Sequence, residues 1–322
     1  MLLGVLAGLL TCALWGLTFV APRLIDPYST VDLTVMRYGA FALGCLVLMI
    51  HPRMRPRRIE PKMWVIGLAL GSVGYIGYFL AAAFAVRLAG AAIPPLIVGL
   101  MPVVLAVIAN ARDRSLPWSR LTRPLALILV GVNIVNLDTL ARTEPGELWS
   151  LLLGIGLSFL ALSAWVAYGL VNSVVMNGPN PPESFHWTAV QGMGAGIGVL
   201  CLLPLATFPD LMAAGAEGTG RFVFWALLLG LAGSLLATWL WLYAATRMPL
   251  ALAAQLIVAE TIFGLGFGFL YEARLPTMPE AVGIVLQVAG VALAIGLFNQ
   301  ARKLRLATEA VIASHDPSSP KG

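Results

Sequence analysis

One carboxylate lies inside a segment of the sequence that is otherwise suited only to hydrocarbon. Glu260 is the single charged residue of LIVAETIFGLG, residues 256–266. If this segment is a membrane helix, Glu260 lies roughly 16 Å from either end of it, too far to reach water. An acidic residue at a bilayer centre costs on the order of 3 kcal/mol, so such residues usually bind a proton or a substrate cation. The alternative is a neutral acid that donates a hydrogen bond to a neighbouring helix.

Aromatic, hydroxyl-bearing and small residues recur at spacings of three and four in several apolar segments, which places them on shared helical faces. The faces are Gly4, Gly8, Thr11, Trp15 and Thr18; Gly67, Gly71, Tyr75 and Tyr78; Pro95, Gly99, Pro102 and Ala106; and Ser158, Ala161, Trp165, Tyr168 and Asn172. This mixture is typical of helices that face one another or a water-filled cavity. Ordinary helix packing with occasional hydrogen bonds is the other interpretation of each face.

Tryptophans and one arginine complete the set of candidate residues. Trp15 and Trp165 lie deep in their segments, whereas an interfacial belt accounts for the tryptophans near segment ends. That belt would contain Trp64, Trp118, Trp149, Trp187, Trp225, Trp239 and Trp241. Arg37 lies early in its segment, so its long side chain could extend to the membrane surface as an anchor, or serve the interior instead.

Signatures of soluble enzymes and of metal sites are absent from the sequence. It contains no HExxH, GxSxG or Walker A motif, and its three cysteines show no CxxC spacing. The glycine strings GMGAGIG and GLGFG follow no predicted strand, so close helix packing explains them better than nucleotide binding. An intramembrane enzyme would need a second catalytic group at the depth of Glu260, and we find none. We expect no enzyme activity, no cofactor and no metal.

The elements that position these residues are membrane helices. Of 322 residues, 59% are hydrophobic and 11% are charged, and the mean hydropathy is +0.89, far from the composition of a soluble domain. The net charge of +5 comes from basic residues in short connectors, which indicates membrane orientation rather than nucleic-acid binding. The sequence predicts an all-α integral membrane protein.

A bilayer core needs roughly 20 apolar helical residues, and ten segments meet this rule approximately. They are residues 2–21, 33–50, 64–86, 91–110, 124–140, 150–172, 187–206, 222–243, 249–270 and 280–298. With both termini in the cytoplasm, 14 Lys and Arg residues lie inside and 5 outside, as the positive-inside rule requires. Without the fifth segment the split falls to 12 against 7. We expect a disordered cytoplasmic tail over residues 301–322.

Three matches in the same order indicate an internal duplication. RLAGAAIPPLIV from Arg87 resembles RMPLALAAQLIV from Arg247, RDRSLP from Arg112 resembles YEARLP from Tyr271, and Trp15 precedes Trp165 by 150 residues. Each half would hold five spans, and an odd number places the halves in opposite orientations. We therefore expect two inverted five-helix repeats, residues 1–142 and 149–300.

Four stretches resemble the drug/metabolite transporter superfamily, and its EamA-like ten-helix branch fits best. They are ALWGLTFVAPRL, TVMRYGAFALG, GLMPVVLAVI and VAETIFGLGFGFLYEARLPT, and the resemblance covers residues 2–300. It implies a central cavity between the halves, with the fifth and tenth helices peripheral. Trp15, Pro102, Trp165 and Glu260 would lie on or near the substrate path, and Glu272 with Leu275 would match a motif that closes the ninth helix. Pro94 and Pro95 depart from this pattern and would break the fourth helix near its outer end, and RDRSLP is only a weak counterpart of the closing motif.

The resulting functional hypothesis is a secondary transporter of the bacterial cytoplasmic membrane that exports amino acids or related amphipathic metabolites by alternating access. Sugar-nucleotide or drug transport is the alternative in the same superfamily, and an intramembrane enzyme or a membrane scaffold is the alternative outside it. The expected partners are a small-molecule substrate, the lipid bilayer and, as a candidate coupling ion, the proton bound by Glu260; nucleic acid is not expected. The predicted substrate path contains Trp15, Thr18, Tyr75, Tyr78, Pro102, Trp165, Tyr168 and Glu260.

Overall fold

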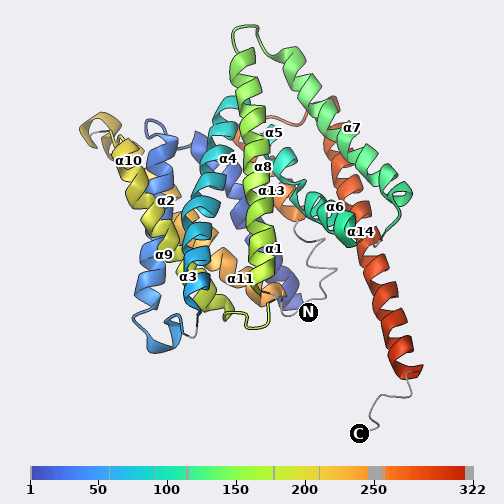
Figure 1. Cartoon of the computed structure of the whole chain (residues 1–322). Coiled ribbons are helices and arrows are strands. Elements are labelled where there is room, and N and C mark those ends of the chain that lie inside the picture. Colours follow the sequence, from blue (N-terminus) through green and yellow to red (C-terminus); the bar gives the residue numbers. More distant parts are fainter. Residues whose placement is uncertain are drawn as a thin grey trace.

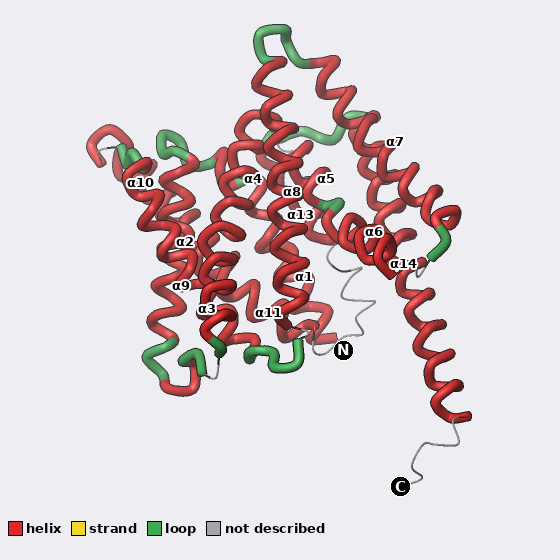
Figure 2. The backbone as a smooth tube through the Cα atoms, in the orientation of Figure 1, coloured by secondary structure: helices red, strands yellow, loops and turns green. Residues whose placement is uncertain are grey.

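The protein is all-helical throughout the part of the chain that the computed structural model describes, residues 2–57, 59–90, 92–113, 116–176, 178–209, 211–245, 256 and 258–315 (Figures 1 and 2). Up to residue 142 the elements are α1 (Leu2–Gly16), the short turns η1 (Leu17–Phe19) and η2 (Ala21–Arg23), α2 (Thr30–Leu48), η3 (Pro52–Met54), α3 (Pro61–Ala69), η4 (Leu70–Tyr75), α4 (Ile76–Ala89), α5 (Ile93–Val98), α6 (Met101–Asp113) and α7 (Trp118–Arg142). After it they are α8 (Leu148–Met176), α9 (Ser184–Leu202), η5 (Leu203–Leu205), α10 (Leu211–Leu227), η6 (Leu228–Leu236), α11 (Ala237–Ala245), α13 (Val258–Tyr271) and α14 (Met278–His315).

Eight helical segments in the described part are long and apolar enough to cross a membrane. They are Leu2–Arg23, Thr30–Leu48, Pro61–Ala89, Trp118–Arg142, Leu148–Met176, Ser184–Leu205, Gly215–Trp241 and Met278–Ala301. Two shorter apolar helices, Ile93–Leu105 and Val258–Tyr271, fall in the remaining two predicted spans. Mean hydropathy therefore located these apolar segments, but it did not reveal that the fourth one is interrupted.

The fourth predicted span is divided into α5 and α6. Pro94 lies in the first turn of α5, where a missing N–H costs nothing, so Pro94 and Pro95 begin this helix rather than break it, contrary to expectation. The break comes instead between Val98 and Met101. Pro102 follows this break. In a continuous helix Pro102 would have no N–H to donate to the carbonyl of Val98, and its ring would clash with that carbonyl.

Of the last two predicted spans, the tenth differs from the structure. The ninth was expected from residue 249, but residues 246–255 and 257 lie outside the described part, and with them the Arg247 side of the repeat match. The last helix is longer than predicted, because α14 continues from the membrane segment to His315. The disordered cytoplasmic tail over residues 301–322 stays a prediction, and residues 316–322 lie outside the described part.

Close helix packing depends on small residues at a few positions. A Cβ added to Gly71 would lie 1.9 Å from the carbonyl oxygen of Gln191, and one added to Gly194 would lie 2.2 Å from that of Leu68. The backbones of α9 and of the α3–η4 segment thus touch directly, as small residues permit in membrane proteins. A similar seam joins α7 to α14, where Gly131 and Gly283 each approach the other's carbonyl. This pair lies to one side of the other helices (Figure 1).

The start of α2 is tied to the end of α9 by one buried carboxylate. Asp32 and Ser29 form a reciprocal capping box, with each side chain accepting from the other's backbone N–H. Asp32 also accepts N–H bonds from Thr207 and Phe208. All of these donors are held by the fold, so Asp32 acts structurally and is not part of a binding site.

We predict that Gly71→Ala destabilises the protein whereas Gly77→Ala does not. The added methyl group at position 71 meets a backbone carbonyl that cannot rotate away, so the cost should be about 1–3 kcal/mol. A Cβ at Gly77 meets nothing within 4 Å, and alanine is the better helix former. Thermal unfolding in detergent measures both variants. Equal melting temperatures for the two would contradict the backbone contact between η4 and α9.

Candidate functional site

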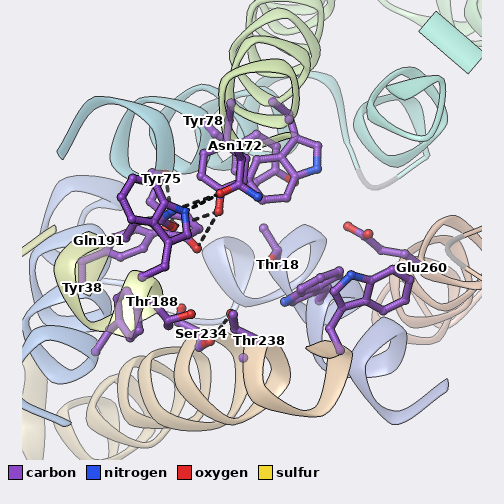
Figure 3. A pocket seen from close by; sticks show the side chains of 18 of the residues that line it. Thr18, Tyr38, Tyr75, Tyr78, Asn172, Thr188, Gln191, Ser234, Thr238 and Glu260 are labelled. Atoms are coloured by element: carbon purple, nitrogen blue, oxygen red, sulfur yellow. Dashed lines mark hydrogen bonds between the residues drawn. The ribbon is translucent and has the colours of Figure 1, made fainter. Parts of the chain in front are cut away.

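A cavity of about 230 Å³ lies between helices from both parts of the chain. Its walls come from α1, η1, α2, η4, α4 and α6 on one side of the sequence and from α8, α9, η6, α11 and α13 on the other (Figure 3). Its polar lining includes Thr18, Tyr38, Tyr75, Tyr78, Asn172, Thr188, Gln191, Ser234, Thr238 and Glu260. It reaches Ser184 and Thr188 at the start of α9, so it extends toward the end of the molecule where α8 finishes.

Four predicted residues form one aromatic wall of this cavity. Trp165 stacks on Tyr168 with ring centroids 4.8 Å apart and on Tyr78 at 4.7 Å. Tyr75 lies 5.1 Å from Tyr168. The helical spacing places Tyr75 and Tyr78 on one face, and the six-residue π-helical segment η4, which ends at Tyr75, shifts the register just before Tyr78, as π-bulges do. The wall offers stacked ring faces to an apolar group.

A chain of hydrogen bonds fixes the polar end of the wall. The Tyr168 hydroxyl donates to Gln191 Oε1 at 2.9 Å, so the Tyr75 hydroxyl, 3.0 Å away, must donate to Tyr168, which has only one O–H. Gln191 Nε2 and Trp187 Nε1 both donate to Asn172 Oδ1, at 3.3 and 2.7 Å. These side chains are bonded to one another, so the network holds their positions in the wall.

Glu260 lies across the cavity from Gln191 and Asn172, with its carboxyl group directed into the cavity (Figure 3). It is half-buried at the start of α13. In the part of the chain that is described, its carboxylate makes no hydrogen bond and no ion pair. A small adjoining cavity of about 20 Å³ is lined by Glu260 together with Pro102 and Thr261. Pro102 therefore lies beside the main cavity and not in its wall.

The remaining predicted path residues, Trp15 and Thr18, lie in the wall of the main cavity. Trp15 tilts against Trp241, with ring centroids 5.8 Å apart. Trp241 was expected in an interfacial belt, as was Trp187, which is only 3% exposed and bonded to Asn172. Both assignments were wrong because position near a span end does not show which side of the helix faces protein.

Arg37 lines the cavity, although it was not placed on the predicted substrate path and the sequence left open whether it anchors at the membrane surface or serves the interior. It is 5% exposed, so it does not extend to the membrane surface. Its Nε donates to Ser234 Oγ at 3.2 Å and its Nη1 to Thr18 Oγ1 at 3.3 Å, and its guanidinium lies 4.3 Å from the centroid of Phe79. Gln191 and Ser234 were missed. Each is a polar residue within an apolar run, the same signal that identified Glu260.

Ion pairs close the opposite end of the molecule. Arg23, at the end of η2, pairs with Glu272, which follows α13, and Tyr271 donates its hydroxyl hydrogen to the Arg23 carbonyl. Arg274 bridges Glu272 and Glu280 at 2.7 and 2.6 Å. Hydrogen bonds to Glu280, above all, hold the pKa of Arg274 above its ordinary value. The network joins segments that are about 250 residues apart in the chain, and Leu275 beside it is exposed.

Comparison with known proteins agrees with a helical membrane protein. Residues 2–137 and 152–296 each match the EamA-like transporter family. The inner membrane protein YtfF of Escherichia coli (strain K12) is 30% identical over 310 residues, covering 92% of this chain and 95% of YtfF. A solved structure titled "Crystal structure of protein" covers 94% of this chain and 98% of its own, with a TM-score of 0.58 at 18% identity, which shows a shared fold. Two matches over nearly the whole chain are decisive: the chain belongs to the EamA-like transporter family.

Proposed function

We propose that this protein is a secondary transporter that exports amino acids or related small amphipathic metabolites across the bacterial cytoplasmic membrane. The observation that carries the proposal is one cavity lined from both family-matching regions, in which stacked aromatic rings lie beside a carboxylate that makes no hydrogen bond or ion pair with the described residues. Its volume of about 230 Å³ lies below the roughly 300–1,000 Å³ of pockets for drug-sized ligands. This favours a small metabolite over a sugar nucleotide or a drug.

An intramembrane enzyme is a weaker explanation of the same cavity. Acid–base or nucleophilic catalysis there would need a second group able to act with Glu260. Glu260 is the one carboxylate in the described lining, which contains no histidine or cysteine. Among the described residues, no group of three or more His, Cys, Asp or Glu could hold a metal.

The proposed architecture has ten spans arranged as two inverted repeats, residues 1–142 and 149–300. A structural parallel between the halves supports it. A π-helical segment interrupts the third predicted span of each half, at Leu70–Tyr75 and at Leu228–Leu236. The two segments begin 158 residues apart, close to the spacing of about 160 in the sequence match.

Alternating access then gives the two ends of the molecule different roles. The Arg23–Glu272–Arg274–Glu280 network would seal the outer end, while the cavity extends inward past Ser184. With both termini in the cytoplasm, this arrangement corresponds to an inward-facing form. Rocking of one repeat against the other would break the seal and expose the cavity outside.

Cells with and without the protein should differ in their sensitivity to internal metabolite load. An exporter lowers the internal concentration of its substrate, so cells that lack it should stop growing at lower doses of peptides that release that amino acid. A panel of dipeptides and structurally related amines, acids and antibiotics tests substrate and direction together. Unchanged sensitivity across the amino acids, with a shift for drugs alone, would contradict the proposal.

The inverted topology predicts the sides of four engineered cysteines. Cysteines at Ser119 and Asn180 should react only with reagents that reach the cytoplasm, and cysteines at Pro145 and Gly215 should react from outside, because 14 of 20 basic residues then lie inside. The native cysteines are replaced by serine or alanine beforehand. Labelling of Ser119 and Pro145 from the same side would eliminate the fifth span and the inverted repeat.

A further inference from the structure

Arg37 is a buried cation without a balancing anion among the described residues. Its two hydrogen-bond acceptors, Ser234 and Thr18, are neutral hydroxyl oxygens, and no carboxylate of the described chain lies within ion-pair distance of it. Its Nη2 donates to no described acceptor. A buried charge is costly unless it is paired, and the ring of Phe79 at 4.3 Å offsets only part of that cost. The cavity therefore offers an arginine fork to an incoming anion.

The same cavity offers Glu260 to a cation, at a separation that can be estimated along α1 and η1. Arg37 donates to Thr18, and the Cys12 thiol lies against the backbone of Glu260. Cys12 and Thr18 are six residues apart, which corresponds to about 9 Å of helical rise. The Glu260 backbone and the Thr18 hydroxyl that Arg37 binds are thus offset along the helix, and no ion pair joins Arg37 to Glu260 among the described residues.

This spacing suits a short zwitterion. A charge-assisted hydrogen bond at each end takes up about 2.8 Å, and the N–Cα–C geometry of an α-amino acid holds its nitrogen about 2.5 Å from its carboxyl carbon. Together these lengths amount to about 8 Å. A molecule with only one charge would satisfy one wall residue and leave the other unpaired, which is the usual origin of strong discrimination in buried sites.

The aromatic wall is available for the rest of such a molecule. Tyr78, Trp165 and Tyr168 present stacked rings, and the Tyr168 hydroxyl is already paired in the Tyr75–Tyr168–Gln191 chain. An apolar side chain can cover these faces without breaking a hydrogen bond.

We propose that Arg37 binds the carboxylate, and Glu260 the ammonium group, of an apolar α-amino acid, so that the cavity selects zwitterions. This inference rests on the proposed function, because it takes the cavity as the substrate site. It adds the charge pattern of the ligand and identifies Arg37 as the residue that binds the carboxylate.

Equilibrium binding to the purified protein in detergent tests the proposal without requiring transport. Trp15, Trp165 and Trp241 line the cavity, so quenching of tryptophan fluorescence reports occupancy. The probes are two matched sets: L-leucine, isoamylamine and 4-methylpentanoate, and L-phenylalanine, phenethylamine and 3-phenylpropionate. In at least one set the amino acid should bind about tenfold more tightly, or better, than either singly charged analogue, a difference of about 1.4 kcal/mol.

Two variants should change this preference in opposite ways. Arg37→Gln should weaken amino-acid binding to the level of the amine without weakening the amine. Glu260→Gln should weaken it to the level of the acid without weakening the acid. Arg37→Lys keeps the charge and should bind with intermediate affinity. Arg87→Gln is the matched control, because Arg87 pairs with Asp26 at the surface, outside the cavity, and it should bind as the wild type does.

Several outcomes would overturn the proposal. They are saturable binding of neither amino acid by folded wild-type protein, equal affinity for an amino acid and its analogues, and an Arg37→Gln variant that weakens amine and amino acid alike, as loss of a purely structural residue would. The proposed transport function is tested separately. Binding with the expected charge pattern but without flux in liposomes would contradict transport and still support the zwitterion site. Amino-acid export that is unaffected by Arg37→Gln would contradict the zwitterion site and still support the transport function.

Discussion

The structure depends on keeping a few charged and polar side chains inside a molecule that is otherwise adapted to hydrocarbon. Arg37 and Glu260 reach the cavity from α2 and α13, helices more than 200 residues apart in the chain. Exposure of either group to lipid would cost several kcal/mol, so the surrounding helices must enclose them and still leave space for a ligand. The glycine contacts between helices and the hydrogen bonds among the wall residues satisfy this constraint in different parts of the bundle.

Tightly packed helices support one side of the cavity, and polar side chains line its wall. Gly71 and Gly194 bring the backbones of the α3–η4 segment and of α9 into contact, which fixes the position of η4, the segment that ends at Tyr75. The chain from Tyr75 to Asn172 then presents paired polar atoms to the cavity. Glu260 and Arg37 are different, because neither has an oppositely charged partner among the described residues. Charges that a fold maintains in this condition are candidates for binding a ligand that supplies the partner.

The sequence predicted the class of the fold and much of the cavity, for a physical reason. Helical spacing is enough to place Tyr75 with Tyr78 and Trp165 with Tyr168, because residues three apart share a face. It could not show that these two faces meet, nor that Trp187 and Trp241 turn inward, since that depends on how helices rotate about their axes. The sequence left the role of Arg37 open because a long side chain near a span end can extend in either direction. The break before Pro102 and the extension of α14 to His315 are also local outcomes that mean hydropathy does not resolve.

The two halves of the chain are matched in one further respect that composition does not reveal. A π-helical segment interrupts the same span of each, and these segments place Tyr75 in one case and Ser234, an acceptor for Arg37, in the other. Such bulges are frequent at functional sites, where a local change of register redirects side chains. The duplication, if inverted, would place both bulges at a similar depth in the membrane, beside the cavity.

Glu260 is the residue on which this account can be tested most directly, by measuring the flux of amino acid through purified protein in liposomes at a series of pH values. Glu260→Gln preserves size and most hydrogen bonding but removes the titratable charge. The account predicts that flux falls at least tenfold and that any dependence on pH due to this carboxyl group disappears, whereas Glu183→Gln, an exposed carboxylate outside the cavity, keeps the wild-type profile. Wild-type flux with an unaltered pH profile in Glu260→Gln, at equal protein content, would contradict the account.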